Sequence, residues 1–120
     1  MIRTDVTAQL GLQVPVLSAP MAGIAGGALA AAVAGAGGLG LIGGGYGDRA
    51  WLEREFDVAG SARVGVGFIT WALASKPDLL TVALERKPAA VMLSFGDLAG
   101  FAPAIHRAGI TLIAQVQTVE

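Results

Sequence analysis

The sequence predicts an α/β fold in which parallel strands alternate with helices, and three observations support this prediction. Short apolar segments recur along the 120-residue chain, and stretches with helical spacing separate them. Strands that are apolar on both faces are typical of a parallel sheet covered by helices. The predicted strands end about every 24 residues, a regular unit that suits either a (β/α)8 barrel or a doubly wound sheet.

The apolar segments predict five strands. The residue before a proline favours an extended backbone, which places the end of the first strand at Ala19. Glycine-containing segments follow most of the others and mark where they stop. The predicted strands are residues 14–19, 38–42, 63–68, 90–95 and 110–115.

Composition, spacing and capping residues predict four helices between these strands. The first, residues 25–36, is rich in alanine, the strongest helix former. Asp48 is the expected N-cap of the second helix, and residues 77–86 form the third. Asp97 is the expected cap of the fourth helix, which ends at Gly109.

Charge and cysteine content exclude several classes of protein. Eight Lys and Arg against nine Asp and Glu give a net charge of −1 without a basic cluster, which argues against a nucleic-acid partner. The absence of Cys excludes disulfides, Cys-based zinc sites and a thiolate nucleophile, and it fits a cytoplasmic location. Glycines interrupt the longest uncharged stretch, so no membrane helix is expected.

Residues 1–120 are expected to form one partial domain. Only 14% of the residues are charged, against about 25% in an average soluble domain, which indicates a piece rich in interior surface. A full barrel needs about 250 residues, and five strands cannot close one. We therefore expect a barrel truncated after about five strands, whose open edge pairs with a second copy or with a missing C-terminal half-barrel.

Glycines and other small residues follow several predicted strands, where the ligand sites of parallel sheets are found. These segments, at the carboxyl ends of the strands, are residues 19–23, 43–47, 65–68 and 94–96, and residues 115–117 end the fifth strand. Gly35, Gly37 and Gly40 also fit the dinucleotide pattern G-x-G-x-x-G, but they follow a helix and open a strand, the reverse of a Rossmann unit. We attribute that pattern to chance and expect the site at the strand ends.

The polar residues suggest no catalytic or metal-binding set. His106 is the only histidine and is expected near the solvated end of a helix. Ser94 ends a predicted strand but has no histidine at a neighbouring strand end with which to form a triad. No pair of His or carboxylate residues has the spacing of metal ligands. Trp51, Trp71 and Phe101 are expected to pack in the core or in a subunit contact.

Four segments together resemble the nitronate monooxygenases, also called 2-nitropropane dioxygenases. The stretch APMAGIAGGALAAAVAGAGGLGLIGGG resembles the opening of that family. The segments RVGVGFITW, PAAVMLSFGD and AGITLIAQVQTVE resemble its successive strands in the right order. The resemblance extends from about Val14 to Glu120 and corresponds to roughly the first half of the family's barrel.

The resemblance implies a (β/α)8 TIM-type barrel that binds FMN at the carboxyl ends of its strands and oxidises alkyl nitronates with O2 to a carbonyl compound and nitrite. Gln115 matches a polar position that faces the flavin in the family, and Gly67 stands where many members carry Asn, which removes an amide contact. The residues implied to line the flavin through their backbone are Ala19, Pro20, Met21, Ala22 and Gly23.

The resemblance leaves alternatives open. The family's catalytic His lies in an E-A-G-G-H-type segment that this sequence lacks, so no catalytic residue is assigned and the chain alone is expected to be inactive. Flavin-dependent enoyl-acyl-carrier-protein reductases have a similar glycine-rich opening, and they would use NAD(P)H to reduce a fatty-acyl double bond. A non-enzymatic barrel fragment that needs a partner is the third interpretation.

Overall fold

The computed structural model describes residues 1–120 and contains one sheet of four parallel strands. The strands are β1 (Leu41–Gly43), β2 (Gly65–Ile69), β3 (Ala90–Ser94) and β4 (Thr111–Ala114). Their order in the sheet is β1-β2-β3-β4, so each strand pairs with the next along the chain. A doubly wound sheet reverses its order at a switch point, whereas a barrel does not. The arrangement is therefore that of consecutive units of a (β/α)8 barrel.

The first of the five predicted strands is reduced to one isolated bridge, which corrects the strand count to four. Leu17 bridges Leu39 in parallel, and the N–H of Leu39 donates to the carbonyl of Val16 at 2.9 Å. The ladder does not extend towards the N-terminus because Pro15 has no N–H and the N–H of Val16 turns back to the carbonyl of Val14. The segment nevertheless lies beside β1, in the place predicted for it.

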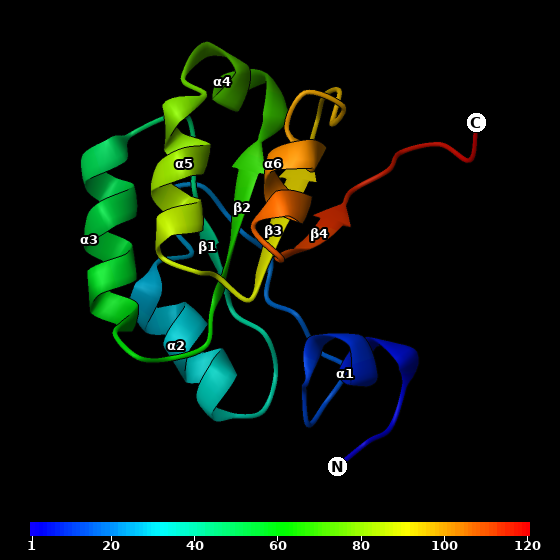
Figure 1. The fold of residues 1–120 in the computed structure, drawn as a ribbon. Helices are drawn as coiled ribbons and strands as arrows, with labels where there is room; N and C mark the ends of the chain where they lie inside the picture. Colours follow the sequence, from blue (N-terminus) through cyan, green and yellow to red (C-terminus); the bar gives the residue numbers. More distant parts are fainter.

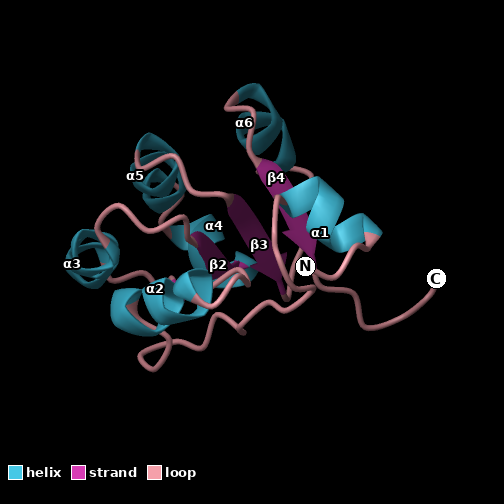
Figure 2. Ribbon diagram, turned by 90° about the horizontal axis from the view of Figure 1, so that it is seen from below, coloured by secondary structure: helices cyan, strands magenta, loops and turns pink.

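The four predicted helices cover the same face of the sheet, as Figures 1 and 2 show. They are α2 (Gly27–Gly35), α3 (Arg49–Ala59), α5 (Asp78–Glu85) and α6 (Ala102–Arg107). Asp48 caps α3 as predicted, because its Oδ1 accepts a hydrogen bond from the N–H of Trp51 at 3.0 Å. Asp97 is not a helix cap. Its carboxylate accepts from Ala99 N in a local turn, and α6 begins five residues later.

Two short helices were not predicted. In α1 (Asp5–Leu10), Thr4 and Thr7 form a reciprocal capping box, with side chain to backbone N–H distances of 3.1 and 2.8 Å. The second, α4 (Thr70–Ser75), follows β2 without an intervening loop. Each has six residues, too few to show a helical hydrophobic stripe in the sequence. No helix is both long enough and apolar enough to cross a membrane.

The main core lies between the helices and the outer face of the sheet. Along β2 the residues alternate, so that Val66 and Phe68 point to the helices while Gly65 and Gly67 point to the inner face. The helices meet this face with buried apolar side chains, each less than 9% exposed: Ala30, Leu52, Phe56, Leu73, Leu79, Leu80, Ala83 and Ile105.

A smaller cluster closes the inner face at the amino-terminal ends of the strands. Leu10 and Leu12, from the end of α1 and just after it, pack with Leu39, Leu41 and Ala90. Figure 1 shows α1 at this end of the sheet, and the guanidinium of Arg63 donates to the carbonyl of Leu10 at 2.6 Å. Because α1 fills the amino end, the inner face is accessible from the carboxyl ends of the strands.

The packing of α2 on β1 predicts opposite effects for two glycine substitutions. A Cβ at Gly40 would collide with the backbone of Ala30, whereas Gly35 has open space around it. We expect Gly40→Ala to lower the free energy of unfolding by about 1–3 kcal/mol, as overpacked core positions do. Gly35→Ala should raise it by about 0.5 kcal/mol through better helix propensity. Urea unfolding followed by circular dichroism measures both, and equal effects would contradict the described packing.

Candidate functional site at the carboxyl ends of the strands

A cavity of about 250 Å³ lies at the carboxyl ends of the strands, on the inner face. We call it the mouth cavity. Five of the seven residues predicted to contact a flavin line it: Ala19, Pro20, Ala22, Gly67 and Gln115. These residues come from three distant parts of the sequence, and the parallel sheet brings them together because all its strands end at the same side.

The remaining two predicted residues lie beside the mouth cavity and do not line it. The carbonyl of Met21 lies against Gly43, where a Cβ would collide with it, and the Met21 side chain is exposed. Gly23 lines a separate, larger cavity and has a positive φ of 69°. Residues 19–23 therefore contact both cavities at this end of the sheet.

Gly67 provides the floor of the mouth cavity by having no side chain. A Cβ at this position would collide with the ring of Pro20, which rests on the strand there. Gly67 is level with Met92 of β3, and Met92 is level with Ile113 of β4. The Pro20 ring thus occupies the place where, by the family resemblance, many members carry the side chain of an Asn.

Several lining residues were not among the predicted contacts. Ser94 and Met92 line the cavity from β3, and Ser94 is only 7% exposed. Phe95 follows them with φ of 59°, a left-handed conformation that is an outlier for a bulky side chain, and it is 54% exposed. Side chains alternate between the two faces along β3, and this alternation could have identified Met92 and Ser94 as inward-facing from the sequence. Nothing in the local sequence predicts the left-handed backbone conformation of Phe95.

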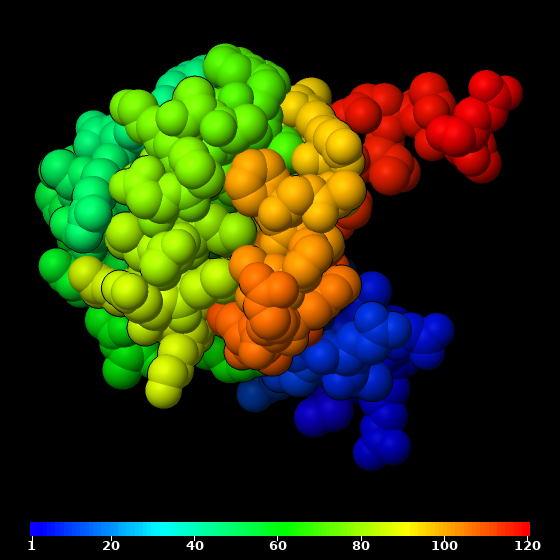
Figure 3. All heavy atoms as spheres, turned by 45° about the horizontal axis from the view of Figure 1, so that its top comes forward, coloured from blue at the N-terminus to red at the C-terminus, as the bar shows by residue number.

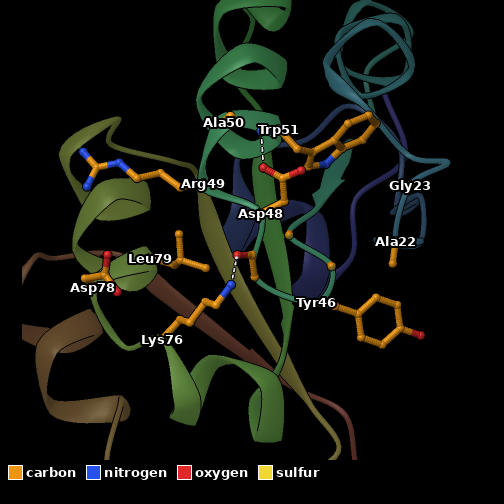
Figure 4. Close-up of a pocket in the computed structure, with 13 residues that line it drawn as sticks. Ala22, Gly23, Tyr46, Asp48, Arg49, Ala50, Trp51, Lys76, Asp78 and Leu79 are labelled. Atoms are coloured by element: carbon orange, nitrogen blue, oxygen red, sulfur yellow. Dashed lines mark hydrogen bonds between the residues drawn. The ribbon is translucent and has the colours of Figure 1, made fainter.

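A second cavity, of about 820 Å³, lies outside the sheet and is called the outer cavity here (Figure 4). Residues 44–51 form one wall, and Lys76 and Leu79, at the connection between α4 and α5, form another. The ammonium of Lys76 donates to the carbonyl of Gly47 at 2.9 Å and so ties the two walls together. Ala22 and Gly45 line both cavities, which makes the cavities neighbours.

The residues of the mouth fit a flat cofactor such as a flavin ring. Small residues and Pro20 leave a surface without projecting side chains, so a ring can approach the backbone. The N–H groups of Ala22 and Gly45, which both line the mouth cavity, make no hydrogen bond within the chain, and they can donate to the acceptor atoms on a flavin edge. His106 lies in the last turn of α6 and lines neither cavity, and no cluster of His, Asp or Glu has the arrangement of a metal site.

The strand order and the rim define the chain as part of a (β/α)8-type barrel. No protein-family profile and no curated protein matches it. Among solved structures it is similar to FabK from Thermotoga maritima, with 31% identity and a TM-score of 0.86 over 98% of this chain and 39% of FabK. A mutant of the same FabK gives 31% identity and 0.86 over 98% of this chain and 40% of that one.

The similarity to FabK supports the broad barrel family, but it covers only part of the length of FabK. The chain spans about two-fifths of FabK, so the comparison concerns the strands and rim described above and not a whole barrel. It supports the broad barrel family that the sequence indicated, but it does not favour the nitronate monooxygenases within that family.

The contact between Pro20 and Gly67 predicts a non-additive pair of substitutions. Gly67→Ala should lower the free energy of unfolding by about 1–3 kcal/mol because the new Cβ displaces the Pro20 ring. Pro20→Gly removes that ring, so the double variant should be more stable than the sum of the two single effects implies. Urea unfolding of the four proteins measures this coupling, and strict additivity would show that the two residues do not touch.

Proposed function

We propose that the chain forms the flavin-contacting part of a barrel oxidoreductase of the enoyl-thioester reductase type, with FMN as cofactor. The observation that carries the proposal is the similarity to FabK over 98% of the chain, which favours the enoyl reductase alternative over nitronate oxidation. The mouth cavity supports it, because its small residues and unpaired amides suit a flat cofactor. FMN bound here supplies hydride transfer between NAD(P)H and the conjugated double bond of the substrate.

The chain's own residues would bind and orient the flavin and shield the reacting atoms from water. The amides of Ala22 and Gly45 would donate to the polar edge of the ring, and Pro20 would lie against it. Met92 and Phe95 line the same cavity with apolar groups that exclude water from the reacting atoms. Gln115 offers a side-chain amide at the end of β4, where it can orient the ring or the substrate carbonyl.

Oxidation of alkyl nitronates with O2 is the second candidate. The segments that resemble the nitronate monooxygenases include the whole of β2 and its continuation into α4, and these residues form the floor and one side of the rim. Both candidates use the same flavin and the same mouth, so they differ in what reduces the flavin.

The proposal extends to a partner at the open edge of the sheet. No strand pairs with β4 on its far side, and Thr111 and Ala114 are exposed. Unpaired strand edges bind further strands readily. We propose that a C-terminal half-barrel or a second copy of the chain pairs there. Size-exclusion chromatography tests obligatory pairing, which a stable monomer would contradict.

One anaerobic experiment separates the two candidate reactions. The purified chain is mixed with FMN, and binding is measured by the change in flavin fluorescence. NADH or an alkyl nitronate is then added separately, and the visible absorbance of the flavin is followed. The chain alone is expected to bind FMN without turnover, so the redox steps are followed with the barrel completed by its C-terminal partner. There we expect bleaching by NADH and recovery on addition of an enoyl thioester. Bleaching by the nitronate alone would instead support nitronate oxidation, and a folded chain that binds no FMN would refute both.

The flavin position predicts a specific effect at Ala22. Ala22→Leu fills the boundary between the two cavities and should weaken FMN binding at least tenfold without unfolding the chain. Ala32→Leu adds the same atoms on the exposed side of α2, away from both cavities, and should leave binding unchanged. Fluorescence titration with FMN measures both constants. Equal affinities for the two variants would place the flavin elsewhere.

A further inference from the structure

The outer cavity is left without a role by the proposed function. Its volume of about 820 Å³ lies in the range of about 300–1,000 Å³ that small-molecule sites occupy, and it exceeds the 250 Å³ of the mouth cavity. It lies outside the sheet, between the loop that follows β1 and the connection from α4 to α5 (Figure 4). A cavity of this size can hold a nucleotide-sized group.

Lys76 is the cation of this cavity that no carboxylate neutralises. Its ammonium bonds only to the carbonyl of Gly47 and takes part in no ion pair. Arg49, the other basic lining residue, is paired with Glu53 at 2.9 Å. An ammonium has three donors, so Lys76 keeps two for a ligand.

Neither carboxylate that lines the cavity, Asp48 or Asp78, forms an ion pair with Lys76. One oxygen of Asp48 accepts the N–H of Trp51 at the start of α3. Asp78 has no hydrogen-bond partner, and Figure 4 shows Leu79 between it and Lys76. The ammonium therefore faces the hollow without a direct anionic neighbour.

Unpaired backbone amides lie beside Lys76. The N–H groups of Tyr46 and Gly47 have no acceptor within the chain. Gly45 and Gly47 have φ of 65° and 102°, a conformation that favours glycine at both positions. A cation together with free backbone N–H groups is the chemistry that binds phosphate oxygens.

Two exposed aromatic rings stand at the edge of the cavity. Tyr46, which lines it, and Trp71 are 69% and 60% exposed, and their ring centroids are 6.0 Å apart at an interplanar angle of 46°. Trp71 therefore does not pack in the core, and a subunit contact, the other expectation for it, remains a prediction. The two rings follow β1 and β2, and β2 is already paired on both edges, so an additional strand cannot cover them there. Exposed aromatic faces stack well on planar bases.

We propose that the outer cavity binds an adenosine diphosphate group, with the base on Tyr46 and Trp71 and the phosphates at Lys76 and the amides of Tyr46 and Gly47. The proposal rests on the proposed function, because nicotinamide dinucleotides and coenzyme A thioesters both carry this group and both are plausible substrates of an enoyl reductase. Ala22 and Gly45 border both cavities, so the rest of such a ligand can extend to the mouth.

The direct test is titration of the purified chain with ADP by isothermal calorimetry. Lys76→Gln keeps a donor for the Gly47 carbonyl and removes the charge, and it should weaken ADP binding about tenfold or more. Tyr46→Leu removes one ring and should also weaken binding. Lys87→Gln makes the same charge change away from the cavity and is the matched control. No binding of ADP, or equal loss in both Lys variants, would overturn the proposal.

Competition experiments identify the source of the group and separate this proposal from the one on which it rests. ADP should compete with NADH if the ligand is the dinucleotide, and with an acyl-coenzyme A if it is the thioester. Nicotinamide mononucleotide and a pantetheine thioester lack the group and should not compete. FMN binding that persists while ADP fails to bind would refute the outer site alone. ADP binding without FMN binding would refute the flavin function alone.

Discussion

Close approach of neighbouring segments to the backbone, permitted by glycine, is the constraint on which this structure depends. Gly40 lets the backbone of Ala30 in α2 lie directly on the segment that leads into β1. Gly67 lets the ring of Pro20 rest on β2 at the inner face of the sheet. A side chain at either position would separate two layers and leave a gap that the neighbouring residues cannot fill. The position of the helices and the shape of the mouth cavity therefore share one physical cause.

Much of the fold could be predicted because periodicity and capping act locally. The residues of β2, β3 and β4 form continuous apolar runs, and Asp48 caps α3 through a contact only three residues away. The predictions fail where a single residue or a very short element determines the local structure. Pro15 interrupts a strand that was apolar enough to be predicted, and α1 depends on two threonines that bond to each other. Six-residue helices contain less than two turns, so they carry too few apolar positions to be recognised.

Only part of the candidate site could be predicted from the sequence. The topology alone places strand ends together, so Ala19, Gly67 and Gln115 could be assigned to one rim before any contact was known. The outer cavity could not be predicted, because Lys76 reaches Gly47 across 29 positions of sequence. Nor could the exposure of Trp71, because a large aromatic residue after a buried strand is more often part of the core.

The sequential order of the strands has a consequence for how the chain acquires its structure. Every strand pairs with the one that precedes it, and residues 116–120 project from the body as an extended tail (Figure 3). Each βα unit can therefore dock as soon as it leaves the ribosome, since its partner has already been synthesised. Short sequence separations between contacting elements also favour rapid folding. The exception is α1, which is made first but finds Leu41 and Ala90 only later, so its docking would be a late step that consolidates the sheet.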